Sequence, residues 1–137
     1  MNESRIFLDK AERSLRAAER HLNEGEPDFA ASHAYYACFY IAEALLASEG
    51  VSFSRHGQVL SQYGLRFAQT EKLDRRFHQV LTRAFRIRNI ADYQVEVPIQ
   101  PEDVQELIKG GQSFLAAASH YLEELPGTES GGGGEDG

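Results

Sequence analysis

The chain has 137 residues, a formal net charge of −7 and a sequence isoelectric point near 5.2. This length predicts one domain that can bury a core without disulfides or metal. The single cysteine, Cys38, cannot form an internal disulfide, which favours a reducing cytoplasm. The charged N-terminus predicts no signal peptide, and the central apolar run is shorter than the ~20 residues that span a bilayer. We therefore expect a soluble cytoplasmic protein without a membrane partner, whose acidic charge opposes non-specific nucleic-acid binding.

Positive charge is nevertheless concentrated in one window of the sequence. Six basic residues fall close together there, namely Lys72, Arg75, Arg76, Arg83, Arg86 and Arg88. Such a basic strip can bind a phosphate backbone or an acidic partner. The same pattern is also typical of a solvated helix face, so the strip leaves both interpretations open.

The first predicted helix extends from about Glu3 to Asn23. Its apolar residues recur at steps of three and four and should form one inward stripe of Ile6, Ala11, Leu15, Ala18 and Leu22. Pro27 suits the first turn of the next helix, where its missing N–H has no intrahelical partner. Residues 30–46 contain one charge, Glu43, and apolar side chains surround the helix axis. This stretch therefore predicts the central helix of an all-α bundle.

A short third helix and a longer fourth helix are expected next. Ser54 can cap a third helix that begins near Arg55, and Gly57 and Gly64 should make that helix short or bent. Thr70 is the predicted N-cap of the fourth helix. Its apolar sector is Leu73, Phe77, Val80, Leu81, Ala84, Ile87 and Ala91.

The last predicted helix begins at Pro101, after a connection over residues 93–100 that contains Pro98. Gly110 and Gly111 would lower its stability, and a close helix–helix crossing would explain them. The helical domain should therefore comprise residues 1–125. Residues 126–137 are rich in glycine and acid and are expected to form a flexible, disordered tail.

One position on the fourth helix departs from its own pattern. Arg88 falls within the inward sector, and an unpaired buried guanidinium would be very costly. Asp92, one turn later, can supply a partner. Two interpretations remain open: an Arg88–Asp92 pair that orders the helix end, or an arginine in a groove that binds phosphate.

Other catalytic patterns are weak. The histidines lack metal-ligand spacing and are scattered along the chain, at His21, His33, His56, His78 and His120. We therefore expect no metal and no cofactor.

Three segments are informative together, namely AYYACFYIAEALL (residues 34–46), SRHGQVLSQYGLRF (54–67) and FRIRNIADY (85–93). In this order they resemble the HEPN domain family, in particular its small stand-alone bacterial and archaeal members. The resemblance covers about residues 3–125. It implies an up-and-down bundle of four main helices with one short extra helix, which is usually dimeric. It also implies either a metal-independent endoribonuclease or a toxin paired with a small nucleotidyltransferase antitoxin.

The family's nuclease signature is an arginine, often followed by asparagine, with a histidine four to six residues after the arginine. Arg88 and Asn89 match its first half, whereas Asp92 or Tyr93 stands where the histidine would be. A carboxylate is a poor substitute for histidine in acid–base cleavage near neutral pH. His56 could instead be brought near the fourth helix and act as the base.

Three functions are therefore kept open. The first is a helical module, partner of a nucleotidyltransferase, that binds a nucleotide or RNA phosphate through Arg88, Asn89, Asp92 and Tyr93. The second is an endoribonuclease toxin that uses Arg88 with Asp92, Tyr93 or His56. The third is a structural dimer without a ligand. Because the central helix has more apolar surface than one small bundle covers, we expect a homodimer.

Overall fold

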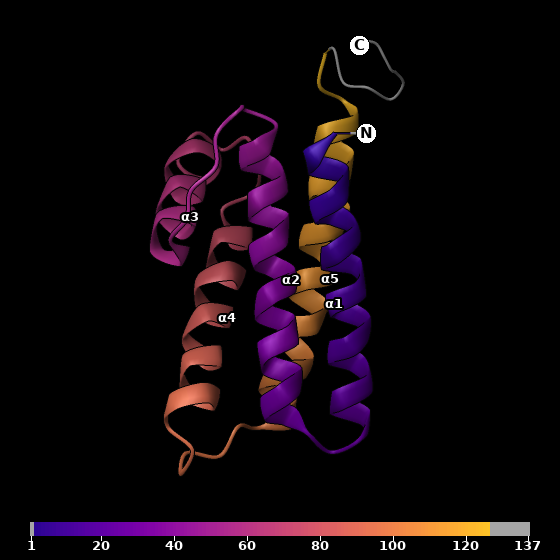
Figure 1. Ribbon diagram of the computed structural model, residues 1–137, viewed down its shortest axis with the longest axis vertical. Helices are drawn as coiled ribbons and strands as arrows, with labels where there is room; N and C mark the ends of the chain where they lie inside the picture. The colour runs from indigo at the N-terminus through magenta and orange to yellow at the C-terminus, as the bar shows by residue number, and fades with distance from the viewer. Residues whose placement is uncertain (1, 127–137) are drawn as a thin grey trace.

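The structure is a computed structural model, and it describes residues 2–126; Met1 and residues 127–137 lie outside the described part. The elements in chain order are α1 (Glu3–Asn23), α2 (Pro27–Ala47), α3 (His56–Tyr63), the π-helical turn η1 (Gly64–Ala68), α4 (Arg76–Tyr93) and α5 (Pro101–Glu123). The four long helices run along the long axis, and α3 packs at one end beside α2 and α4 (Figure 1). The predicted all-α bundle is confirmed.

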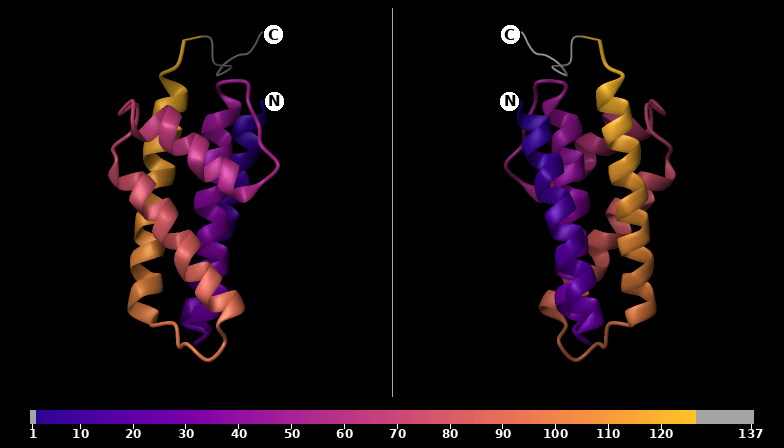
Figure 2. Two further views of the ribbon diagram at one scale, coloured as in Figure 1. Left: turned by 90° about the vertical axis from the view of Figure 1, so that its left-hand side faces the viewer. Right: turned by 90° about the vertical axis from the view of Figure 1, so that its right-hand side faces the viewer.

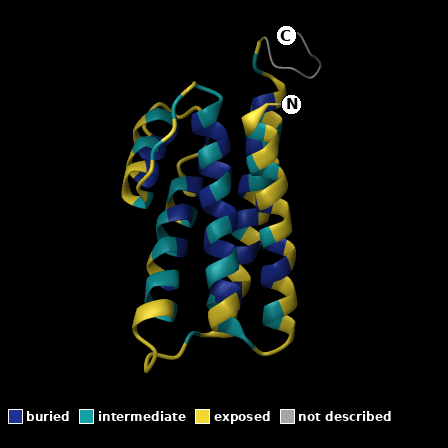
Figure 3. Cartoon of the chain, viewed as in Figure 1, coloured by how far each residue is buried: buried dark blue, intermediate teal, exposed yellow. Residues whose placement is uncertain are grey.

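The central helix α2 contacts all four other α-helices, as its apolar pattern predicted. It is buried along most of its length, from Ala30 to Leu46, whereas α1 and α5 expose their outer faces (Figure 3). The chain turns from α1 into α2 through Gly25, whose φ of +79° suits glycine, and Pro27 lies in the first turn of α2 as expected. In α1 the predicted stripe holds except at Ile6, which is 43% exposed. Its neighbours Phe7 and Leu8 pack against the core, so Ile6 is exposed because it lies on another face of α1.

The expected cap of α3 is wrong. Arg55 occupies the N-cap position of α3, and no side chain caps the helix there. The expected weakness at Gly64 is confirmed, because α3 ends at Tyr63 and continues as the π-helical turn η1. A methyl group added at Gly64 would lie 2.9 Å from Nε2 of His78 on α4, so the missing side chain permits this close approach.

The start of α4 also differs from the expectation. Thr70 does not cap α4; its hydroxyl donates to the carbonyl of Arg66 at 2.7 Å and thereby closes η1. A turn through Glu71, with φ of +58°, separates η1 from α4. Arg75 occupies the N-cap position of α4 without a side-chain cap, and Asp74 just before it accepts a hydrogen bond from the N–H of Arg76 at 2.9 Å.

Two glycines bring α5 close to its neighbours, as predicted. A methyl group added at Gly110 would lie 3.0 Å from Cγ2 of Val80 on α4, which crosses α5 at an angle (Figure 2). One added at Gly111 would lie 2.9 Å from Cδ2 of Leu15 and 3.5 Å from Sγ of Cys38. Cys38 is fully buried beneath this crossing, and burial raises the pKa of its thiol to about 12.

Two other expectations concern the ends of the chain and the membrane. The predicted tail, residues 126–137, lies outside the described residues apart from Pro126. Among residues 2–126, no helix is both long and apolar enough to cross a membrane.

Candidate functional site

Arg88 lies in the last turns of α4 and reaches toward α2. Its side chain is 15% exposed, and its Nε is 2.9 Å from Oδ2 of Asp92 in an ion pair that lacks hydrogen-bond geometry. Nη1 donates to Oδ1 of Asn89 at 3.3 Å, and Nη2 donates to the hydroxyl of Tyr36 on α2 at 3.1 Å. The charge of Arg88 is therefore balanced within α4, whereas its position is fixed by α2.

Two tyrosine rings of α2 cover the guanidinium. Its central carbon lies 5.3 Å from the ring centroid of Tyr35 and 5.5 Å from that of Tyr36. A cation at these distances is attracted to the aromatic ring, and the attraction grows when water is partly excluded. The two rings therefore hold the Arg88 side chain in place independently of its ion pair.

Asp92 is the more exposed member of the ion pair. Its side chain is 34% exposed, and its Oδ1 accepts a hydrogen bond from the hydroxyl of Ser32 at 3.1 Å. Ser32, Tyr35 and Tyr36 are spaced by three and four residues, so one face of α2 contacts both Asp92 and Arg88. Water reaches the carboxylate, and Asp92 can therefore move away from Arg88 without becoming a buried unpaired charge.

His56, the first residue of α3, belongs to the same site. Its Nδ1 lies 2.9 Å from the hydroxyl of Tyr35, and its ring centroid is 4.3 Å from that of Phe39. Burial and the positive charge of Arg88 lower the pKa of His56 below its usual value of 6.5. Burial raises the pKa of Tyr35, which keeps its hydroxyl protonated at neutral pH. When Nδ1 carries the proton and donates to Tyr35, Nε2 is left as a free base.

The structure brings together most of the residues that the sequence singled out. We use the name Arg88 cluster for Ser32, Tyr35 and Tyr36 of α2, His56 of α3, and Arg88, Asn89 and Asp92 of α4. Tyr93 is not among them, since its side chain is 74% exposed. One residue after Asp92 on a helix, a side chain points about 100° away, which places Tyr93 off the face that meets α2. Its proposed role in binding or catalysis stays a prediction.

Sequence reasoning missed the contribution of α2. The sequence predicted an apolar central helix without functional side chains, yet Tyr35 and Tyr36 present their hydroxyls to His56 and Arg88. The signal that could have revealed them is the spacing of Ser32, Tyr35 and Tyr36, which puts three hydroxyl groups on one side of an otherwise apolar helix.

The basic strip is largely paired within the chain, which favours the solvated-face interpretation. Nζ of Lys72 lies 2.9 Å from a carboxylate oxygen of Glu49. Arg83 pairs with Asp103 at 3.3 Å and with Glu106 at 2.8 Å, both on α5. Arg88 differs from these residues in being the least exposed of the paired arginines of the strip.

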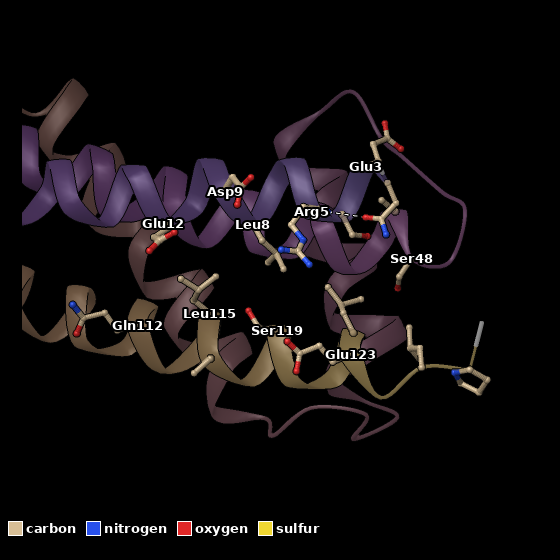
Figure 4. A pocket seen from close by; sticks show the side chains of 17 residues that line it. Glu3, Arg5, Leu8, Asp9, Glu12, Ser48, Gln112, Leu115, Ser119 and Glu123 are labelled. Atoms are coloured by element: carbon tan, nitrogen blue, oxygen red, sulfur yellow. Dashed lines mark hydrogen bonds between the residues drawn. The ribbon is translucent and has the colours of Figure 1, made fainter. Parts of the chain in front are cut away.

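A cavity of about 710 Å³ lies elsewhere in the bundle, between the first half of α1 and the second half of α5 (Figure 4). Its walls mix apolar and charged side chains, including Arg5, Leu8, Asp9, Leu115, Ser119 and Glu123. No member of the Arg88 cluster lines this cavity, so its volume provides no room for a ligand of Arg88.

The comparisons with known proteins agree with the all-α fold. Residues 4–122 match the family model of the HEPN domain, and the chain therefore belongs to the HEPN domain family. A protein of Methanocaldococcus jannaschii named "putative toxin" is 34% identical over 116 residues, which cover 85% of this chain and 79% of the relative. A protein of Thermotoga maritima named UPF0332 is 31% identical over 129 residues, which cover 91% of this chain and 98% of the relative. A UPF0332 protein of Gloeobacter violaceus is 32% identical over 123 residues, or 89% of this chain and 98% of that protein.

Proposed function

We propose that this HEPN protein binds a phosphate group of a nucleotide or of RNA through the Arg88 cluster, as the partner of a small nucleotidyltransferase. The observation that carries the proposal is that polar groups from three helices gather around one guanidinium, that of Arg88, whose side chain is 15% exposed. Tyr36 and Asp92 contact the guanidinium directly. His56 and Ser32 are joined to it through Tyr35 and Asp92, respectively. Arginine matches the geometry of phosphate oxygens, and hydroxyl and imidazole groups beside it supply further hydrogen bonds.

A phosphate would compete with Asp92 for the guanidinium. Asp92 is the exposed member of the pair, whereas Arg88 is held by the rings of Tyr35 and Tyr36. An incoming anion would therefore displace the carboxylate toward water and find the arginine already in position. Asp92 would then lower the affinity for anions in general and limit binding to ligands that make contacts beyond one phosphate.

The test measures binding of fluorescein-labelled single-stranded RNA by anisotropy and of ATP by calorimetry. Arg88→Ala should weaken binding by about tenfold or more, and Arg88→Lys should recover only part of it, since a point charge replaces the planar fork. Asp92→Asn should strengthen binding by about three- to tenfold because a competing negative charge is removed. Arg83→Ala is the matched control and should change binding by less than about twofold. If Arg83→Ala and Arg88→Ala weaken RNA and ATP binding equally, binding reflects general charge attraction and the proposed phosphate site at Arg88 is wrong.

The nucleotidyltransferase partnership has its own experiment. The relative from Methanocaldococcus jannaschii carries the word toxin in its name, which supports a role in a toxin–antitoxin pair. The proposal predicts that a gene for a small nucleotidyltransferase lies beside this one, and that its product, co-expressed with this chain, co-purifies with it at a fixed ratio. A homodimer that buries at least ~1,000 Å² is proposed for the protein alone on the strength of the family resemblance, because the apolar surface of α2 is already covered within one chain. Light scattering that gives a monomer at tens of micromolar would exclude the homodimer.

A second function, metal-independent RNA cleavage, is favoured by the position of His56. Its ring lies against Tyr35 and Tyr36, the two residues that cover Arg88, and its lowered pKa leaves it neutral and able to accept a proton. Cleavage of RNA in the presence of a chelator should then disappear in His56→Ala and in Arg88→Ala. Retention of cleavage in His56→Ala would exclude His56 as the base, and Asp92→Asn and Tyr93→Phe test the two remaining candidates.

A further inference from the structure

Three potential metal ligands converge where α1 turns into α2. They are His21 in the last turn of α1, Glu24 just after the helix, and Glu26 just before α2. One ligand atom from each lies within 4.8 Å of the other two, and Nδ1 of His21 is 2.7 Å from Oε1 of Glu26. Among residues 2–126, this is the one group of three or more histidine, cysteine or acidic side chains that meets this condition.

The backbone of the turn holds the three residues in this arrangement. The N–H of Glu24 donates to the carbonyl of Arg20 at 3.0 Å, and the N–H of Glu26 donates to the carbonyl of His21 at 2.9 Å. Between them Gly25 adopts a φ of +79°, which reverses the chain and returns Glu26 to the imidazole. The spacing of the ligands therefore follows from the way in which α1 ends.

The imidazole is also fixed from its sides. The ring of His33 on α2 stacks on His21 with centroids 5.0 Å apart and planes within 7° of parallel. The ring of Phe29 meets His21 edge-on at 5.7 Å. A ligand ring that is already oriented loses less freedom when it binds an ion, which favours binding at a partly exposed site.

We infer that His21, Glu24 and Glu26 bind a divalent transition-metal ion of the zinc class. One imidazole nitrogen and two carboxylates are ligands that Zn²⁺ accepts, and three protein ligands leave a fourth position for water or an exchangeable donor. Ligand atoms around a tetrahedral Zn²⁺ at about 2.1 Å lie roughly 3.4 Å apart. The three groups therefore need only small side-chain shifts to surround the ion.

The charges of the turn also suit a cation. Two carboxylates offset the charge of the ion, and the C-terminal end of α1 carries the negative end of the helix dipole. This site shares no residue with the Arg88 cluster, so the inference of a metal site does not depend on the proposal of phosphate binding.

The sequence did not predict this site, because metal ligands were sought at helical spacing. Here the ligands lie at i, i+3 and i+5, and they converge only because the chain reverses at Gly25. The end of α5 provides a natural control. His120 is followed by Glu123 and Glu124 at nearly the same spacing, yet these side chains do not converge.

The experiment titrates the metal-free full chain with ZnCl₂ by calorimetry and follows Tm in parallel. Zn²⁺ should bind at one site per chain and raise Tm by about 3 °C or more at saturation. MgCl₂ at the same concentration should give neither effect, since Mg²⁺ prefers oxygen ligands and keeps its water. His21→Ala and Glu24→Gln should each weaken Zn²⁺ binding by about tenfold or more, because one of three ligands is lost.

Control variants test whether Zn²⁺ binding depends on this turn rather than on any histidine of the chain. His120→Ala should bind Zn²⁺ within about twofold of the wild type, and circular dichroism checks that each variant folds. Glu24 is exposed, so Glu24→Gln keeps the test valid if His21→Ala fails to fold. Zn²⁺ binding that is unchanged in Glu24→Gln, or lost in His120→Ala, would overturn the inference, as would the absence of binding to the wild type.

Discussion

Helix α4 carries two arginines that make different kinds of contact with the helices on either side. Arg83 faces α5 and pairs with Asp103 and Glu106, both on that helix. Close to it, the ring of Phe77 stacks on Phe114 at 5.3 Å, and Val80 approaches Gly110. The α4–α5 contact therefore joins two helices by apolar packing, with charge pairs at its edge.

Arg88 faces α2 and meets no carboxylate there. Its acidic partner, Asp92, is on its own helix, and α2 contributes hydroxyl groups and rings instead. The ion pairs of Arg83 join two helices, so a ligand that displaced its partners would break contacts between α4 and α5. Arg88 can exchange its carboxylate partner without breaking an ion pair between helices, and this difference makes Arg88 the candidate for ligand binding.

The largest effect is expected from breaking the α4–α5 contact. Phe114 is fully buried and packs against Phe77 and Tyr63, so Phe114→Ala should lower the free energy of unfolding by about 3–5 kcal/mol. Urea unfolding followed by circular dichroism measures this. RNA and ATP binding by the folded fraction should be unchanged. A loss below about 1 kcal/mol would mean that α5 contributes little to the core.

The second test compares the two arginines directly. Arg88→Ala should cost about 2 kcal/mol, because a mostly buried side chain and its contacts with two rings are lost. Arg83→Ala should cost less than about 1 kcal/mol, since its side chain is 37% exposed and its ion pairs are screened by water.

Adding Asp92→Ala to Arg88→Ala sharpens this comparison. Because water reaches Asp92, the double variant should recover no more than about 0.5 kcal/mol over the single variant. If chemical denaturation shows that most of the lost stability is recovered, the Arg88–Asp92 ion pair is buried and serves only to stabilise the fold. That result would also remove the reason for proposing that Arg88 binds a ligand.

A smaller effect on stability is expected from Tyr36→Phe. This change removes the hydroxyl that accepts from Nη2 of Arg88 and leaves the ring in place, so it should cost about 0.5–1 kcal/mol. Thermal unfolding measures the cost, and RNA anisotropy measures the effect on binding, which should exceed that of Arg83→Ala. Unchanged RNA binding would mean that the hydroxyl of Tyr36 serves only to position Arg88.

The smallest effect is expected in the pH dependence that His56 gives to the free energy of unfolding. The pKa of His56 is lower in the folded chain than its usual 6.5, so the unfolded chain binds more protons and stability falls as pH decreases through 6.5. The stability difference between wild type and His56→Gln should therefore shrink from pH 8 to pH 5, as measured by urea unfolding. Glu43, with a pKa raised to about 6, acts in the opposite direction but is present in both proteins and cancels. A difference that does not change with pH would contradict the lowered pKa.

The starts and close crossings of helices could be predicted from the sequence where one residue type has a single effect on the backbone. Pro27 and Pro101 mark helix starts, and the glycine pair at 110–111 indicated a close crossing, because these residues act through their own backbone. The caps at Ser54 and Thr70 failed because hydroxyl residues serve several kinds of turn, and Asp74 competes for the start of α4.

Only part of the Arg88 cluster could be predicted from the sequence in this way. Arg88 and Asp92 follow from helical spacing on α4, and the approach of His56 was a hypothesis that the structure supports through Tyr35. The part played by Ser32 and Tyr36 depends on which side of α2 faces α4. That orientation is decided by packing among all the helices, and an apolar surface around the whole of α2 carries no local signal for it.

The buried thiol of Cys38 beneath Gly111 is a natural probe of how often the core opens. At neutral pH the raised pKa of Cys38 leaves almost no thiolate, and complete burial denies reagents access while α2 and α5 stay packed. Alkylation can therefore proceed only during rare openings, and its rate divided by that of a free thiol equals the fraction of time that the core spends open. Since the sequence contains one cysteine, the mass of the intact chain reports that fraction without any label or engineered residue.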